Sequence, residues 1–203
     1  MKIICAITAR KGSKGIKNKK IIKINNIPLI EYTFQAVSKS LIKKNTFILT
    51  DSTKIKNIAK KYSINTSYIR PKHTSNDKSS TICTLRHFSD WFLKKNDYDA
   101  IILLQPTSPL RNSYDINKSI NIFKKKKYAS LSSISNHLEH PYDAVNLKNK
   151  SKLEFVESIK EIKSKGLKPG LIIEVQNNEL ESTWNFILEN NIQWIVIMGV
   201  PIG

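Results

Sequence analysis

A short loop near the start of the chain carries the residue types that bind phosphate. It reads TARKGSKGIKNKK, residues 8–20, and directly follows the apolar run IICAI. Arg10 can hold phosphate oxygens with its two-pronged guanidinium group, while Lys14 and Lys19 can act as mobile point charges. The loop is therefore a candidate site for the phosphates of a nucleotide. The alternative is a solvated run of charge in a lysine-rich protein.

Two glycines in the same loop favour the phosphate interpretation. Gly12 and Gly15 permit a positive φ and let backbone N–H groups approach an anion closely. The spacing matches neither the Walker pattern nor a dinucleotide GxGxxG. By itself the loop predicts an anion-binding site, but it does not indicate which family of nucleotide-binding proteins the chain belongs to.

Three further polar segments follow apolar runs of the sequence. They are a turn at Asp51, the stretch RPKHTSNDKSS at 70–80 and the stretch QPTSPLR at 105–111. In open α/β sheets, ligands bind beyond the carboxyl ends of the strands, so these segments and the 8–20 loop are expected to meet at one crevice. Each has a structural alternative: Asp51 as a helix cap, Arg70 as an ordinary surface residue, and 105–111 as a loop that only ends a strand.

The elements that must position these loops alternate between strand and helix. Continuous apolar runs predict strands, and apolar residues at helical spacing predict helices, with Pro28 in a first helical turn. This order predicts an α/β, Rossmann-like domain with a mostly parallel sheet and helices on both faces. The predicted strands are 2–8, 46–50, 64–69, 99–106 and 129–135, and the predicted helices are 27–40, 52–62, 81–95 and 114–127.

Composition narrows the class of protein. The formal net charge is +18, but thirty of the basic residues are lysines and only four are arginines. The chain shows no RNA-binding aromatic signature, zinc finger or basic zipper, which favours a lysine-coated enzyme over a nucleic-acid-binding protein. No run of ~18 apolar residues predicts a membrane span, so no membrane partner is expected. Cys5 and Cys83 are unclustered, as expected for a cytoplasmic protein.

The charge is uneven along the chain and predicts a boundary. Residues 1–151 carry a net charge of +20 and residues 152–203 a net charge of −2. We therefore expect one domain at 1–150 and a short βαβ tail at 151–203. In the tail, the pattern predicts a strand at 171–175, a helix at 179–191 and a strand at 192–200.

Two of the loops together resemble a known family. ARKGSKGI with its following lysines, and LLQPTSPLR after a later strand, look like the acylneuraminate cytidylyltransferases, also called CMP-sugar synthetases. The resemblance covers about residues 1–145 and includes the middle segment 50–81 in order and spacing. It implies a nucleotide-diphospho-sugar transferase-like fold. It also implies transfer of CMP from CTP to a 2-keto sugar acid of the sialic acid type, with release of pyrophosphate.

The resemblance also implies roles for residues. Arg10 and Lys19 would be catalytic, and the acidic sugar would lie against Gln105, Thr107, Ser108 and Arg111, with Arg111 pairing with its carboxylate. It further implies Mg²⁺ or Mn²⁺ as cofactor with unknown ligands, a homodimer, and a place in the synthesis of surface polysaccharide. The nucleotide-binding residues would be Ala9, Arg10, Gly12, Lys14, Lys19, Arg70, Asp77 and Ser80.

The sequence departs from the family pattern at two places. Lys20 stands where the family usually has an asparagine. The late pair of aspartates that binds magnesium in the family does not appear, and the tail is instead similar to a fragment of the ribulose-phosphate epimerases. A module that binds nucleotide but is catalytically impaired is therefore a second hypothesis, and a lysine-rich nucleic-acid-binding protein is a third.

Overall fold

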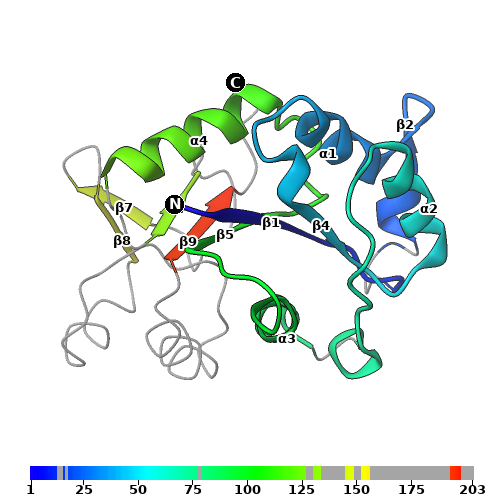
Figure 1. Ribbon diagram of the computed structural model, residues 1–203. Helices are drawn as coiled ribbons and strands as arrows, with labels where there is room; N and C mark the ends of the chain where they lie inside the picture. The colour runs from blue at the N-terminus through cyan, green and yellow to red at the C-terminus, as the bar shows by residue number, and fades with distance from the viewer. Residues whose placement is uncertain are drawn as a thin grey trace.

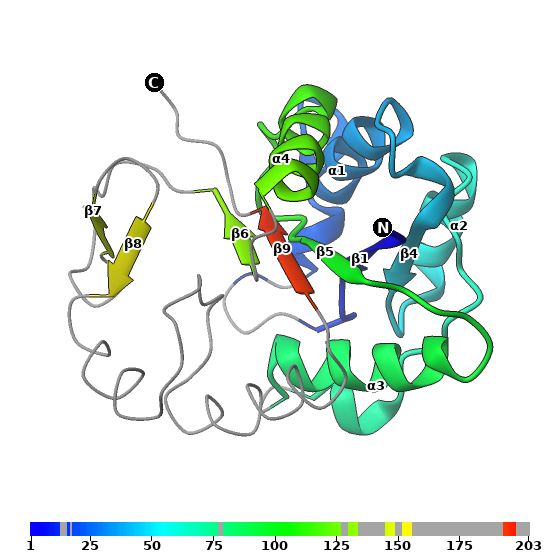
Figure 2. The same cartoon turned by 60° about the vertical axis from the view of Figure 1, so that its left-hand side comes forward.

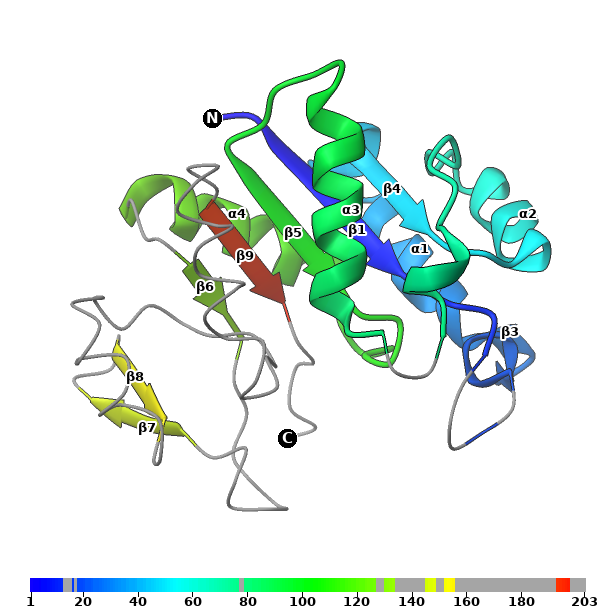
Figure 3. The same ribbon diagram turned by 90° about the horizontal axis from the view of Figure 1, so that it is seen from below.

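The computed structural model describes residues 1–12, 16, 18–76, 79–126, 130–133, 145–148, 152–155 and 193–197. Its centre is a five-stranded sheet in which each pair of neighbouring strands is parallel (Figures 1 and 3). The strand order is β4 (Thr46–Leu49), β1 (Ile3–Thr8), β5 (Ala100–Leu104), β9 (Gln193–Ile197) and β6 (Ser130–Ser132). The predicted α/β class with a mostly parallel sheet is confirmed.

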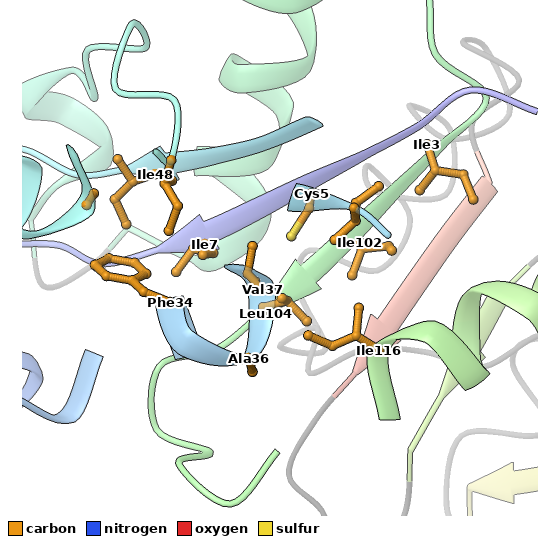
Figure 4. Close-up of a cluster of buried hydrophobic side chains, with 14 of the residues drawn as sticks. Ile3, Cys5, Ile7, Phe34, Ala36, Val37, Ile48, Ile102, Leu104 and Ile116 are labelled. Atoms are coloured by element: carbon orange, nitrogen blue, oxygen red, sulfur yellow. The ribbon is translucent and has the colours of Figure 1, made fainter. Parts of the chain in front are cut away.

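The three strands β4, β1 and β5 are buried on both faces, as their continuous apolar runs predict. Successive side chains of a strand point to opposite faces, so each strand contributes to two cores. On one face, Cys5, Ile7, Ile102 and Leu104 lie in a single cluster with Phe34 and other helix residues (Figure 4). The opposite face is packed by the alternate residues of the same strands.

Helices cover both faces of the sheet (Figures 1 and 2). Helices α1 (Leu29–Ser38), α2 (Thr53–Lys61) and α4 (Ser113–Lys126) contribute to the first core, and α3 (Thr81–Leu93) contributes to the second. Pro28 is the N-cap of α1 and not a residue of its first turn, because its extended ψ of 135 directs the chain out of strand β3 (Ile27–Pro28). Ser52 caps α2, since its side chain accepts a hydrogen bond from the backbone N of Ile55.

The strand predicted at 64–69 is wrong. This segment makes one isolated parallel bridge, between Asn65 and Phe47, and forms no ladder. The Asn65 side chain accepts a hydrogen bond from the backbone N of Ser67 at 2.8 Å. Such an Asx turn bends the backbone after one pairing, which explains why the segment leaves the sheet edge.

Strand β9 comes from the far end of the chain and joins the central sheet between β5 and β6. Its register pairs Ile197 with Leu104 of β5 and Val196 with Ser132 of β6. The strand predicted at 192–200 is thus confirmed. The strand predicted at 171–175 and the helix predicted at 179–191 lie outside the described residues, and the boundary near 150 stays a prediction.

Small elements complete the described chain. Two antiparallel hairpins join β2 (Lys23–Ile24) with β3 (Ile27–Pro28) and β7 (Val145–Lys148) with β8 (Lys152–Phe155). Three short 3-10 helices are η1 (Lys19–Ile21), η2 (Lys43–Asn45) and η3 (Lys72–Thr74). Within the described parts of the chain, none of the helices has the length and apolar character needed to cross a membrane.

Candidate active site

The carboxyl ends of β4, β1 and β5 coincide at one edge of the sheet. The register pairs Thr8, the last residue of β1, with Leu49, the last residue of β4, and pairs Ile7 with Leu104, the last residue of β5. The loops that follow these strands therefore begin side by side (Figure 3). This is the edge at which open α/β sheets bind ligands.

The loop after β1 is tied to the turn after β4. The backbone N of Ala9 donates to the carbonyl of Leu49 at 3.0 Å, and the backbone N of Lys11 donates to Oδ1 of Asp51 at 2.6 Å. Asp51 is therefore not the cap of α2, which was one alternative. Its carboxylate fixes the path of the cationic loop as it leaves the sheet.

The loop re-enters regular structure through a tight turn at Asn18, whose φ is 57. The backbone N of Lys19 donates to the carbonyl of Ile16 at 3.1 Å, and η1 begins at Lys19. Both Lys19 and Lys20 are half-buried. The turn thus directs two consecutive lysines back toward the protein.

Lys20 lies among positive charges. Burial lowers the pKa of Lys20, and the nearby cations Arg10, Arg70 and Lys19 lower this pKa further, while Asp51 opposes the shift. Among the described residues, four basic side chains thus lie in one region with the carboxylate of Asp51. Such an excess of cations favours an anionic ligand.

Arg70 belongs to this cationic cluster, and the alternative that it is an ordinary surface residue is wrong. It is only 6% exposed, and its Nε and Nη2 both donate to the carbonyl of Thr74, the former at 3.1 Å. Burial lowers the pKa of the Arg70 guanidinium, Asp51 and Tyr68 oppose this shift, and Arg10 adds to it. Its fixed partner in η3 holds the side chain in one orientation.

Ser80 is the N-cap of α3. Its side chain accepts a hydrogen bond from the backbone N of Cys83 at 3.1 Å. A hydroxyl group that accepts this bond still has its O–H available as a donor. Asp77 and Lys14, two other predicted nucleotide-binding residues, lie outside the described residues.

Gly12 differs from its prediction. Its φ is not in the left-handed region, and a Cβ added at this position would meet no atom within 4 Å. In this geometry neither the backbone conformation nor the space at residue 12 requires a glycine. Gly15 lies outside the described residues.

The loop after β5 is organised around a buried arginine. Arg111 is 2% exposed, and its Nη2 donates to the carbonyl of Gln105 at 2.5 Å and to that of Ser108 at 3.5 Å. Burial lowers the pKa of Arg111 to about 10. The sequence predicts a guanidinium that faces the sugar, whereas here the guanidinium is enclosed by the protein and supports the loop backbone. Thr107 is exposed, and Gln105 and Ser108 are half-buried.

Comparisons with known proteins show the family to which the chain belongs. A family model described as cytidylyltransferase matches residues 4–168. The chain belongs to the cytidylyltransferase family. The matched region contains all four loops that were considered from the sequence.

The chain is similar in sequence to several curated bacterial proteins that carry different names. It is 35% identical over 145 residues to the post-translational flagellin modification protein B of Campylobacter coli, covering 69% of this chain and 60% of that protein. It is 33% identical over 135 residues to an N-acylneuraminate cytidylyltransferase of Escherichia coli O18:K1:H7, covering 66% of this chain and 31% of that protein. The chain thus spans less than two thirds of the length of either.

Solved structures share the fold of this family member. The structure of a CMP:2-keto-3-deoxy-manno-octonic acid synthetase complexed with CTP aligns with a TM-score of 0.56 at 16% identity, covering 98% of this chain and 91% of that one. A cytidylyltransferase from Leptospira borgpetersenii aligns with a TM-score of 0.54 at 17% identity, covering 97% and 75%. The predicted nucleotidyltransferase-like fold is confirmed.

The described residues of this family member contain no cluster of metal-ligating side chains. Among them, no three His, Cys, Asp or Glu residues gather closely enough to hold a metal ion. At the cationic cluster the acidic neighbour of Lys20 is Asp51. At nucleotide sites magnesium is usually bound by one or two carboxylates together with phosphates of the substrate. The expected Mg²⁺ or Mn²⁺ stays a prediction.

One member of the cluster was missed by sequence reasoning. Lys20 was considered only as a departure from the family pattern, and its half-buried position beside Arg10 and Arg70 was not predicted. In a chain with thirty lysines, the composition gives no reason to single out Lys20. The turn at Asn18 was the available signal, because asparagine tolerates a left-handed φ that reverses the chain.

Proposed function

We propose that this protein is a CTP-dependent cytidylyltransferase that activates an acidic 2-keto sugar of the sialic, legionaminic or pseudaminic acid type. The observation that carries the proposal is the cationic cluster of Arg10, Lys19, Lys20 and Arg70 at the carboxyl edge of a parallel sheet. Membership of the cytidylyltransferase family and relatives such as a CMP-N,N'-diacetyllegionaminic acid synthase of Campylobacter jejuni, 37% identical over 106 residues, support it.

In the proposed reaction, the anomeric hydroxyl oxygen of the sugar forms a bond to the α-phosphorus of CTP. The bond between this phosphorus and the oxygen bridging to the β-phosphate breaks, and pyrophosphate leaves with that bond's electron pair. The hydroxyl proton passes to solvent. The protein's task is to align two anions and to neutralise the charge on the phosphates.

The residues divide between the two substrates. Arg10 and Lys19 would hold the triphosphate, while Arg70 and Ser80, with the O–H of the latter as a donor, would lie beside the nucleoside. Gln105, Thr107 and Ser108 would face the sugar acid. We assign Arg111 a positioning role, since its Nη2 holds the carbonyls of Gln105 and Ser108.

Pyrophosphate release tests the proposal. The full chain is incubated with CTP, Mg²⁺ and one of several sugar acids, including N-acetylneuraminate, legionaminate, pseudaminate and Kdo. We expect release with at least one sugar acid and a loss of at least about 100-fold in kcat/KM in Arg10→Ala, as for a charged group on the reacting phosphates. Lys23→Ala, an exposed residue of β2, is the matched control and should retain activity.

The outcomes separate the hypotheses. CTP binding without turnover for any sugar acid would favour the module that binds nucleotide without catalysis. Absence of CTP binding would contradict the proposal. A steeply salt-dependent affinity for DNA without CTP binding would favour the nucleic-acid alternative. Light scattering during size-exclusion chromatography tests the expected homodimer.

A further inference from the structure

The position of Lys20 is unusual for a lysine in a strongly basic protein. Most lysines extend into solvent, but Lys20 is half-buried on η1 with Arg10, Arg70 and Lys19 as its cationic neighbours. Within the described part of the chain, no salt bridge of 4 Å or less joins Lys20 to Asp51 or to another carboxylate. Its ammonium group is thus held near like charges without a close counter-ion.

The carboxylate of Asp51 is already engaged. Asp51 accepts the hydrogen bond from the backbone N of Lys11 at 2.6 Å, and its charge is shared between Arg70 and Lys20. Among the described residues, the charged neighbours that shift the pKa of Lys20 are thus three cations and the carboxylate of Asp51. Placing like charges together disfavours the folded protein unless a polyanion occupies the region.

We propose that the Lys20 ammonium group is a direct ligand of the nucleotide's phosphates, in addition to Arg10 and Lys19. The proposal rests on the proposed function, because it places CTP at the same cluster. It adds a cation to those of Arg10, Lys19 and Arg70, at a position where the family pattern leads one to expect a neutral amide. The ammonium group belongs to the protein, so the charge it supplies to the bound phosphates does not depend on a bound metal ion.

A ligand role for Lys20 has a consequence for proton binding. In the free protein, burial and the neighbouring cations lower the pKa of Lys20. Bound phosphates add negative charge and raise this pKa again. At a pH between the pKa of Lys20 in the free protein and its pKa in the complex, Lys20 is deprotonated in the free protein and protonated in the complex. CTP binding in this pH range therefore takes up a proton. This uptake is expected to grow as the pH rises from neutrality toward the ordinary pKa of lysine, about 10.4.

Calorimetric titration without metal tests the inference. CTP, inorganic triphosphate and cytidine are titrated into the full chain in EDTA, at several pH values and in two buffers of different ionisation enthalpy. The variants are Lys20→Met, which removes the charge, Lys20→Arg, which keeps a permanent charge, and Lys23→Met, the exposed control. Thermal unfolding of each variant shows that it is folded.

The expected results separate the contribution of the Lys20 charge to affinity from the uptake of a proton. Lys20→Met should weaken binding of CTP and of inorganic triphosphate by roughly 10- to 100-fold, as for loss of a charge-assisted hydrogen bond, and should abolish proton uptake. Lys20→Arg should retain most of the affinity but take up no proton, because a guanidinium stays protonated. Lys23→Met should match the wild type, and cytidine should bind every variant equally.

Two results would overturn the inference in distinguishable ways. If the wild type binds CTP but Lys20→Met matches Lys23→Met in affinity and in proton uptake, Lys20 is not a ligand, although the proposed function stands. If the wild type binds neither CTP nor inorganic triphosphate, with and without Mg²⁺, the proposed function and this inference fall together.

Discussion

At the scale of single residues, Asp51 has two opposing effects on the site. Its Oδ1 accepts the hydrogen bond from the backbone N of Lys11 and so holds the cationic loop against β4. Its negative charge also attracts Arg70 and Lys20, which weakens the attraction of the cluster for phosphate. Two substitutions at this residue can separate anchoring from charge.

We expect Asp51→Asn to bind CTP as tightly as the wild type or several-fold more tightly, because an amide oxygen can still accept the bond while the opposing charge is gone. Asp51→Ala removes the acceptor as well and should bind CTP about tenfold more weakly than Asp51→Asn, as for loss of a hydrogen bond to a charged group. Fluorescence or calorimetric titration measures both. Equal affinities of the two variants would show that the contact to Lys11 does not position the loop.

At the scale of elements, two helices begin with a serine that caps them in the same way. The Ser52 side chain accepts from the backbone N of Ile55 at the start of α2, and the Ser80 side chain accepts from that of Cys83 at the start of α3. Ser80 was predicted to lie beside the nucleoside and Ser52 was not. The pair therefore offers a matched comparison of structural and binding roles.

We expect Ser52→Ala and Ser80→Ala each to lower the free energy of unfolding by about 1 kcal/mol, the usual contribution of a serine cap. For a chain of this size that corresponds to a shift in Tm of about 2–4 °C. Only Ser80→Ala should also weaken CTP binding, because its O–H would lose its acceptor on the ligand. If both variants bind CTP like the wild type, Ser80 is a cap and not a nucleotide ligand.

At the scale of the whole molecule, β9 connects the two sides of the central sheet. It pairs with β5 on one side and β6 on the other, so β6 joins the sheet through a strand that lies about sixty residues later in the sequence. By contrast, β8 belongs to a two-stranded hairpin with β7. Backbone hydrogen bonds of β9 are thus central to the fold, and those of β8 are peripheral.

We expect Val196→Pro in β9 to destabilise the chain by about 3 kcal/mol or more, because proline removes a ladder hydrogen bond in an interior strand. Leu153→Pro in β8 is the control and should lower Tm much less. Thermal unfolding followed by circular dichroism measures both. Equal shifts in Tm would show that the fold of residues 1–133 does not depend on β9. This is the result expected if residues 1–150 form a separate domain.

Much of the fold was predictable from neighbouring residues in the sequence. Continuous apolar runs predicted β1, β4 and β5, and helical spacing predicted the four α-helices of the described residues, because the period of the backbone decides which side chains face a core. The loops that follow these strands were predicted to meet, and the bonds from Ala9 and Lys11 to the β4 turn confirm this for two of them.

Only the tertiary structure decided the strand order, the burial of charge and the neighbours of Lys20. The position of β9 between β5 and β6 depends on contacts between residues far apart in the chain, which local periodicity does not encode. Arg70 and Arg111 are buried in the tertiary structure, and local periodicity does not encode this burial either. Local patterns determine which elements form, whereas long-range packing determines which charges are buried together, and the chemistry of this site depends on the second.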